Sequence, residues 1–235
     1  MQSCDANAMT AFDRRYFEEQ ATYGRSGGYR AMEGNVRRFY GLYIALAKRS
    51  VPQISAGEGK TALDLGCAFG VGVRYLCDLG YDAYGVDVSE YAIEEARRQG
   101  TAANHYAVTD GQTQIPFARL FDLVTSIHVV EHLADPRRDI AGIVLSMAPR
   151  AHLILATPNP RAKSPYRRFQ KDPTHINEQP PDVWRQWLTD AGLRVHACDT
   201  FHIAPLVHRW LGLRYLRVPQ WLGYDTLLVA QNITT

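Results

Sequence analysis

The sequence predicts an α/β protein with a doubly wound, mostly parallel sheet and helices on both of its faces. Three observations support this fold class. Short apolar segments alternate with segments of helical periodicity, one apolar segment runs straight into a glycine-rich bend, and acidic residues stand at the ends of successive apolar segments. An open sheet of this kind binds ligands at the carboxyl ends of its strands.

The expected elements follow one another in a regular order. Residues 33–49 place Val36, Phe39, Tyr40 and Tyr43 at helical spacing, which predicts a helix packed on the core. Further helices are expected at 71–79, 90–99, 136–147 and 182–191, the last of them stopped by Gly192. Strands are expected at 61–66, 83–88, 105–108, 121–127, 153–156, 193–198 and 225–231.

Composition indicates an ordinary globular protein. The 26 basic and 24 acidic side chains leave a net charge of +2, which is too balanced to indicate a nucleic-acid or membrane partner. No apolar run approaches the length of a membrane span, and the first residues lack the pattern of a secretory signal, so a cytoplasmic location is expected. The four cysteines show no metal-binding spacing and are expected to be free thiols.

One globular unit is expected at residues 51–235, preceded by a helical cap or lid at residues 1–50. An apolar and aromatic insertion at 202–223 precedes the last strand. This insertion fits a lid, a dimer surface or plain core, so the sequence leaves assembly into a homo-oligomer open.

The most informative segment is 63–70, which reads Leu-Asp-Leu-Gly-Cys-Ala-Phe-Gly. A buried strand here enters a bend in which Gly66 and Gly70 let the backbone turn tightly and approach a ligand. Asp64 beside the bend can hold a cationic amino group. A pyrophosphate would need no acid at this position, whereas a methionine moiety with an ammonium group would use one.

Two further acids stand at strand ends. Asp87 ends the second strand about twenty residues after the first glycines, where a carboxylate can bind two ribose hydroxyls. Asp110 follows the third strand, where it can accept a hydrogen bond from an adenine amino group. All these positions lie on one rim of the expected sheet.

In this order the segments resemble the class I S-adenosylmethionine-dependent methyltransferases. The segments that carry the resemblance are 63–70, 85–89, 109–110, 121–136 and 153–159, and together they span most of residues 60–200. Two departures are small: Ala68 takes the third small position of the glycine motif, and 149–151 replaces a usual glycine. The resemblance implies a Rossmann-like sheet of seven strands, with S-adenosylmethionine as cofactor and S-adenosylhomocysteine as product.

The resemblance also implies which residues contact the cofactor. Asp64 and Gly66 would meet the methionine end, Asp87 the ribose, and Val88 and Asp110 the adenine. The remaining expected contacts are Cys67, Ala68, Gly70, Gly111, Ile127 and Tyr29. Tyr29 belongs to an N-terminal segment rich in tyrosine and glycine that can fold over the cofactor, and packing in an aromatic core is the competing interpretation.

The segment His128-Val-Val-Glu-His132 matches a zinc peptidase signature, which requires both histidines on one face of a helix. Here the segment follows a strand directly, so His128 is expected at the strand end and Glu131 with His132 in the turn beyond. The resemblance places this turn beside the sulfonium and the acceptor. The alternative is that these side chains merely fix the loop.

His175 ends the segment Asp172-Pro-Thr-His that follows a basic loop. Because the ordinary pKa of histidine lies near roughly 6.5, a histidine there can deprotonate a hydroxyl. We expect His175 or His132 as the base, with His128 lining the site. A loop histidine bonded to backbone is the alternative. Glu131, His132 and His175 can also gather a divalent metal, as a similar set does in some RNA-end and quinone methyltransferases, but a metal is not the favoured interpretation.

The expected reaction is in-line transfer of a methyl group to a small-molecule acceptor, most simply to a hydroxyl of a sugar, a phenol or a secondary metabolite. N- or C-methylation stays open. The pattern Gly66-x-x-x-Gly70-x-Gly72 also fits an NAD(P)-dependent short-chain dehydrogenase. That class is disfavoured, because the pattern begins after sixty residues and none of the four lysines follows a tyrosine by four positions.

Overall fold

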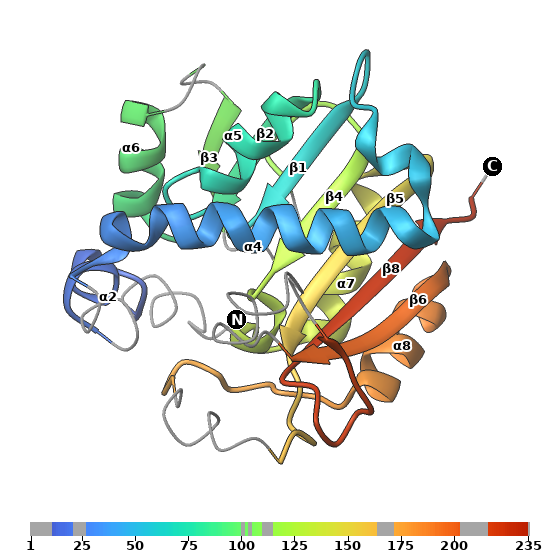
Figure 1. Ribbon diagram of the computed structural model, residues 1–235. Helices are drawn as coiled ribbons and strands as arrows, with labels where there is room; N and C mark the ends of the chain where they lie inside the picture. Colours follow the sequence, from blue (N-terminus) through green and yellow to red (C-terminus); the bar gives the residue numbers. More distant parts are fainter. Residues whose placement is uncertain are drawn as a thin grey trace, which may run out of the picture.

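The computed structural model describes residues 11–20, 27–99, 102, 105–109, 115–163, 172–202 and 216–234. Eight strands form one mixed sheet in the order β3-β2-β1-β4-β5-β8-β6-β7 (Figure 1). The strands are β1 Thr61–Leu65, β2 Asp82–Asp87, β3 Tyr106–Val108, β4 Phe121–Ile127, β5 Met147–Pro158, β6 Leu193–His202, β7 Leu216–Arg217 and β8 Asp225–Asn232.

The strand directions confirm the expected fold class. The pairs β1 with β2, β2 with β3, β1 with β4, and β4 with β5 are all parallel. Strand β8 runs antiparallel to both β5 and β6, and the two-residue strand β7 adds an eighth member to the expected seven. The order reverses between β1 and β4, which is the switch point where sheets of this kind bind ligands.

Helices cover both faces of the sheet (Figure 1). They are α2 Arg14–Glu19, α4 Tyr29–Ser50, α5 Val71–Asp78, α6 Glu90–Gln99, α7 Pro136–Leu145 and α8 Pro181–Asp190, with 3-10 turns η1 Pro52–Ser55 and η3 Val130–His132. Helices α4, α5 and α6 share one hydrophobic cluster with the sheet, and α7 and α8 share the other. In β1, Ala62 belongs to the first cluster and Leu63 to the second, since neighbouring side chains point to opposite faces.

The sequence misplaced the boundary between α7 and β5. The helix was expected to reach Met147 and the strand to begin at residue 153, whereas α7 ends at Leu145 and β5 begins at Met147. Met147 pairs with Phe121, and the next paired residue of β5 is His152, so the residues between them bulge out of the sheet. Arg150 within the bulge has a left-handed φ of 65°, near the position where a glycine is usual.

The N-terminal part contributes two helices to the described structure. Helix α4 begins at Tyr29, four residues before the expected start, and α2 lies in the expected helical cap, where no helix had been located before residue 33. Asp13 caps α2 by accepting a hydrogen bond from the backbone N–H of Tyr16, a contact that side-chain periodicity does not reveal. The division of the chain at residue 50 stays a prediction.

The remaining expectations concern the insertion, membrane spans, the cellular location and assembly. Residues 203–215, which form most of the expected insertion, lie outside the described residues. Among the helices that are described, none is long and apolar enough to cross a bilayer. The cytoplasmic location and the homo-oligomer stay predictions.

Candidate functional site

A cavity of about 380 Å³ lies at the carboxyl ends of β1 and β4, beneath α2 and α4. Its volume falls within the range of roughly 300–1,000 Å³ typical of small-molecule sites. Its walls include aromatic side chains that the N-terminal helices direct inward. The lining residues that the sequence had indicated are Tyr29, Gly66, Cys67, Ala68, Ile127, His128, His132 and His175.

The glycine bend brings the backbone close to its neighbours, as expected. Gly66 and Gly70 both have left-handed backbone angles, with φ of 63° and 73°, and Gly70 caps the start of α5. A side chain at position 66 would collide with Val129 in the turn after β4. The bend and that turn are therefore packed directly against each other, and the backbone at Gly66 borders the cavity.

Asp87 fixes the bend from the neighbouring strand. Its Oδ2 accepts a hydrogen bond from the backbone N–H of Ala68 and its Oδ1 one from that of Ser89, each over 2.9 Å. Burial raises the pKa of Asp87, and these N–H groups oppose the rise. Asp87 and Val88 do not line this cavity, so their contacts with the ribose and the adenine stay predictions.

Asp64 is fully buried under the bend. Its Oδ1 accepts hydrogen bonds from the hydroxyls of Tyr40 and Thr125, each over 2.7 Å, and Oδ2 has no hydrogen-bond partner among the described residues. Burial raises the pKa of Asp64 to about 7. Asp64 does not line the cavity, and its Oδ2 occupies the space that a side chain at position 72 would need. A buried carboxyl with one oxygen unused is of the kind that suits a cationic amino group, and the close backbone at Gly66 borders the cavity, so these residues fit an adenosylmethionine. Contact between Asp64 and the methionine end stays a prediction.

Three other expected cofactor contacts are Asp110, Gly111 and Tyr29. Asp110 and Gly111 lie outside the described residues. Tyr29 lines the cavity and also packs against Phe69 and Phe17, with ring centroids 4.7 and 5.7 Å away. Both interpretations of Tyr29, cofactor contact and aromatic packing, are therefore compatible with its position.

His128 lies between two buried carboxylates. Its Nδ1 is 3.3 Å from Glu131 Oε1, and its Nε2 is 2.9 Å from the hydroxyl of Tyr43, which donates to Asp225 Oδ2 over 3.1 Å. Burial alone would lower the pKa of His128, but Asp225 and Glu131 raise it to about 9. The ring is therefore cationic at neutral pH. It occupies the end of β4, as expected, and takes a left-handed φ of 55°.

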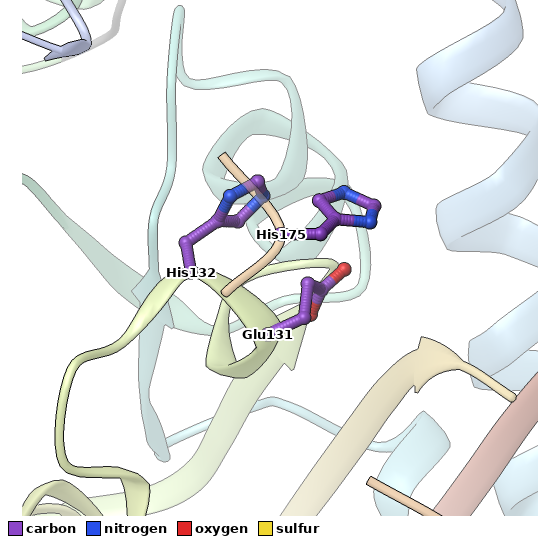
Figure 2. A group of neighbouring side chains, drawn as sticks. All are labelled: Glu131, His132 and His175. Atoms are coloured by element: carbon purple, nitrogen blue, oxygen red, sulfur yellow. The ribbon is translucent and has the colours of Figure 1, made fainter. Parts of the chain in front are cut away.

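Glu131, His132 and His175 lie close together and form what we call the Glu-His-His cluster (Figure 2). His132 and His175 line the cavity, whereas Glu131 is fully buried beside them. One ligand atom from each of the three side chains lies within 4.8 Å of the others. Thr157 donates to Glu131 Oε2 over 3.1 Å, and the backbone N–H of Asn177 donates to the carbonyl of Glu131 over 2.9 Å. Glu131 and His132 belong to η3, the turn that follows β4. The hydrogen bond from Asn177 joins this turn to the segment that contains His175.

The pKa values of the three side chains in the Glu-His-His cluster shift in different directions. The contact with His128 holds the pKa of Glu131 below its usual value, against the effect of burial. Burial lowers the pKa of His132. For His175 burial acts in the same direction, but the bond to Glu178 raises the pKa. The zinc peptidase signature is not formed, since His128 follows the strand and His132 ends a three-residue turn.

Sequence reasoning missed several polar side chains that surround these groups. Tyr40 and Tyr43 were expected only as apolar residues of a helix, and Thr125 and Asp225 only as parts of strands. Thr157 stood one residue beyond the strand expected at 153–156 and was given no role. A signal was present in α4, where two hydroxyl-bearing residues stand three positions apart on the buried face.

A family model described as a methyltransferase domain matches residues 36–197, more than half of the chain. The chain belongs to this methyltransferase family. The match spans most of α4, the glycine bend, the turn after β4 and His175, so it includes much of the cavity wall.

Proteins similar to this methyltransferase in sequence or in structure are methyltransferases as well. It is 30% identical over 168 residues to a ubiquinone biosynthesis O-methyltransferase of Caulobacter sp. strain K31, covering 65% of this chain and 67% of the relative. An S-adenosylmethionine-dependent methyltransferase of Mesorhizobium loti superposes with a TM-score of 0.61 at 18% identity, over 80% of this chain and 96% of that one. The magnesium protoporphyrin IX methyltransferase of Synechocystis PCC 6803 superposes at 0.58 and 16% identity, over 93% and 91%.

The expected class is therefore confirmed. This methyltransferase is a class I enzyme that depends on S-adenosylmethionine. The likeness to the two solved structures shows the fold, and the family match shows the activity class. The individual roles of the site residues stay predictions.

Proposed function

We propose that this methyltransferase transfers a methyl group from S-adenosylmethionine to a hydroxyl of a small aromatic acceptor. The observation that carries the proposal is the Glu-His-His cluster, which sets two imidazoles on a cavity wall that also contains the glycine bend. The relative named as a ubiquinone biosynthesis O-methyltransferase supports a hydroxyl acceptor. No dense cationic surface is visible in the sequence, so a nucleic-acid acceptor is disfavoured.

The lining of the cavity favours a phenol over a sugar. Its walls carry the rings of Phe39, Tyr40, Tyr43 and Tyr224. Aromatic walls of this kind suit a flat, apolar ring, with a few polar groups to orient it. A secondary metabolite with a phenolic ring fits the same walls.

When bound, S-adenosylmethionine supplies an electrophilic methyl group on a positively charged sulfur. His132 or His175 takes the proton of the acceptor hydroxyl on its Nε2. Loss of this proton would leave the acceptor oxygen able to take the methyl group that S-adenosylmethionine would supply, with S-adenosylhomocysteine as the other product. Holding both reactants in this geometry supplies roughly 7–11 kcal/mol of the acceleration.

Calorimetric titration tests whether the enzyme binds S-adenosylmethionine. Heat on addition of S-adenosylmethionine, and none with a reduced nicotinamide cofactor, is the expected result. A set of phenols, alcohols and amines is then incubated with the enzyme and the cofactor, and mass spectrometry detects the methylated product. Methylation of amines alone would reject the hydroxyl acceptor.

Variants of the two histidines test the base. Removal of a general base costs roughly 10²–10⁴-fold in rate, so His132→Gln or His175→Gln is expected to lower kcat by that amount. Thermal denaturation checks that both variants stay folded. Unchanged kcat in both would leave positioning as the whole contribution of the protein.

The close approach of three ligand atoms favours a second means of activating the hydroxyl. A divalent cation held by Glu131, His132 and His175 would act as a Lewis acid on the acceptor oxygen. Dialysis against a chelator, followed by addition of Mg²⁺, Mn²⁺ or Zn²⁺, distinguishes activation by a histidine base from activation by a cation. Full activity after chelation supports the histidine base, and recovery that depends on one metal supports the cation.

A further inference from the structure

His132 turns its Nδ1 toward two oxygen atoms of Thr174. The backbone carbonyl oxygen of Thr174 lies 3.2 Å from Nδ1, and the hydroxyl oxygen lies 3.0 Å from it. A carbonyl oxygen only accepts hydrogen bonds, so Nδ1 must carry a hydrogen. In a neutral imidazole the lone pair then belongs to the other nitrogen. Nε2 is therefore the atom of His132 that can take a proton.

The hydroxyl of Thr174 is itself oriented by Asp172. It donates to Oδ1 of Asp172 over 2.5 Å, and the backbone N–H of Thr174 donates to the same oxygen over 2.9 Å. Because the hydroxyl hydrogen is engaged with Asp172, a lone pair of the hydroxyl is left to accept from His132. The bonds from Thr174 hold the pKa of Asp172 below its usual value, against the effect of burial.

The same chain of bonds continues into the N-terminal segment. Tyr16 on α2 donates to Oδ2 of Asp172 over 3.3 Å. The ring of Phe12 packs edge-on against the ring of His132, with centroids 5.4 Å apart, and against Tyr16 at 4.9 Å. The N-terminal segment thus touches both His132 and the carboxylate that orients Thr174.

We propose that Tyr16, Asp172 and Thr174 are positioning residues that fix the neutral ring of His132 as the Nδ1–H tautomer and leave Nε2 free to accept. The proposal rests on the proposed function, in which Nε2 takes the proton of the acceptor hydroxyl. Helix α2 then contributes to catalysis in addition to covering the cavity, because its residue Tyr16 orients Asp172.

His175 shows the same arrangement with a different partner. Its Nδ1 lies 3.0 Å from Oε1 of Glu178, and a carboxylate oxygen accepts, so Nδ1 carries the hydrogen here too. The two rings pack edge to face, with centroids 4.8 Å apart. In their neutral forms both histidines therefore offer the lone pair of Nε2. The residues that bond to Nδ1, Thr174 and Glu178, both follow the basic loop.

Nitrogen-15 NMR of protein labelled in its eight histidines reads the tautomer directly. A ring nitrogen with a hydrogen resonates in a different region from one with a lone pair, and the signals of His132 are those lost in His132→Gln. At a pH where the ring is neutral, we expect a hydrogen on Nδ1 and none on Nε2. A hydrogen on Nε2 in the wild-type protein overturns the proposal, whatever the activity.

Variants test each link of the chain. Asp172→Ala is expected to lower the share of the Nδ1–H tautomer and to lower kcat by roughly 10–100-fold, with little change in KM. Thr174→Val and Tyr16→Phe are expected to act in the same direction and less strongly. Asp172→Asn keeps an accepting oxygen and is expected to recover most of the kcat lost in Asp172→Ala.

Tyr91→Phe is the matched control. Tyr91 donates to Glu18 over 2.6 Å and so also anchors α2, but the bond touches neither His132 nor Asp172. We expect this variant to keep the wild-type tautomer and kcat. Equal loss of kcat in Tyr91→Phe and Tyr16→Phe would overturn the proposal, because α2 would then act only as a cover.

The same measurements separate this proposal from the proposed function. If NMR finds the Nδ1–H tautomer but His132→Gln methylates at the wild-type rate, the positioning chain exists and His132 is not the base. If the tautomer is reversed and His132→Gln is inactive, the base is supported and the positioning chain is rejected.

Discussion

Asp64 is a buried carboxyl whose surroundings oppose its ionisation. Burial raises its pKa to about 7, although Tyr40 and Thr125 donate hydrogen bonds to it. In the unfolded chain the same carboxyl would ionise near roughly pH 3.9. The folded state therefore binds the proton more tightly than the unfolded state does. The stability that protonated Asp64 contributes is complete below about pH 4 and is lost as the pH rises through about 7.

Asp64→Asn is expected to remove this pH dependence. Between pH 4 and pH 7, the free energy of unfolding of the wild type should fall relative to that of the variant by on the order of 4 kcal/mol. Urea denaturation at several pH values measures the difference. Asp78→Asn is the control, because the side chain of Asp78 is 61% exposed. Parallel curves for wild type and Asp64→Asn would contradict the prediction.

Gly66 combines a left-handed backbone with a tight contact. Its φ is 63°, and a Cβ at this position would collide with Val129. Gly66→Ala is expected to cost more than the roughly 1–2 kcal/mol of the backbone alone. We also expect weaker binding of S-adenosylmethionine, by roughly tenfold or about 1.4 kcal/mol. Thermal denaturation and calorimetric titration measure the two effects.

Gly34 offers the matched glycine for comparison. It lies within α4, and a Cβ there would meet nothing within 4 Å. Gly34→Ala is expected to stabilise the fold by about 0.4–1 kcal/mol, because alanine restricts the unfolded chain and favours helix. If alanine were tolerated equally at both positions, the bend would not be constrained as described.

At the residue scale, the sequence located the side chains that stand in a local pattern. Gly66 and Asp64 stand in a motif, and both lie where that motif predicts, at the end of β1. Tyr43 and Asp225 went unnoticed, because their hydrogen bond joins residues 182 positions apart. Nothing in the neighbouring sequence marks a tyrosine hydroxyl as the partner of a distant carboxylate.

Helix α4 joins the two halves of the cavity. Tyr40 reaches Asp64 below the glycine bend, and Tyr43 reaches Asp225 at the start of β8. The two tyrosines stand three residues apart, so they share one face of the helix. One rigid element therefore sets the spacing between the buried carboxyl beneath the expected cofactor and the pair of His128 and Asp225.

Tyr43→Phe tests this role. The hydroxyl of Tyr43 is the shared partner of Asp225 and His128, so its removal leaves a buried carboxylate with fewer hydrogen bonds. The expected loss of unfolding free energy is about 1–3 kcal/mol, measured by urea denaturation. Tyr81→Phe, which removes a bond to the backbone carbonyl of Ile54, is expected to cost about 0.5–1.5 kcal/mol. A smaller loss in Tyr43→Phe than in Tyr81→Phe would argue against the bridging role.

At the element scale, periodicity located the helices and strands whose apolar pattern is uninterrupted. The strand expected at 121–127 is β4, Phe121–Ile127, and the helix expected at 90–99 is α6, Glu90–Gln99. The boundary after α7 was wrong, because the bulge of β5 places exposed residues within a strand. An interrupted pattern of this kind does not show that the flanking residues still pair with β4.

The N-terminal helix α4 is part of the main core of the molecule. Its residues Tyr43, Ile44 and Ala47 are at most 2% exposed and belong to the cluster that covers one face of the sheet. Deletion of residues 1–50 is therefore expected to abolish cooperative unfolding. Deletion of residues 1–28 keeps α4 and is expected to preserve a cooperative transition at a lower Tm. Melting curves followed by circular dichroism compare the two, and a cooperative melt of residues 51–235 would support a boundary at residue 50.

At the scale of the whole molecule, the sequence predicted the class of sheet and not its strand order. Strand β8 is the last strand in the chain, yet it lies between β5 and β6 and runs antiparallel to both. Seven of its eight residues are buried, which shows that both of its faces are covered. Burial on both faces is the same for either direction of a strand, so the apolar pattern could not distinguish them.

The left-handed backbone of His128 bears on attempts to engineer this protein. A non-glycine residue with a φ of 55° carries strain, which glycine or asparagine would relieve. Either replacement would also discard the ring that contacts Glu131 and Tyr43, and would leave the buried carboxylates of Glu131 and Asp225 without their cation. Because breaking a buried charge pair costs about 3–5 kcal/mol, against roughly 1–2 kcal/mol for a left-handed residue, selection for heat resistance would retain the histidine at position 128.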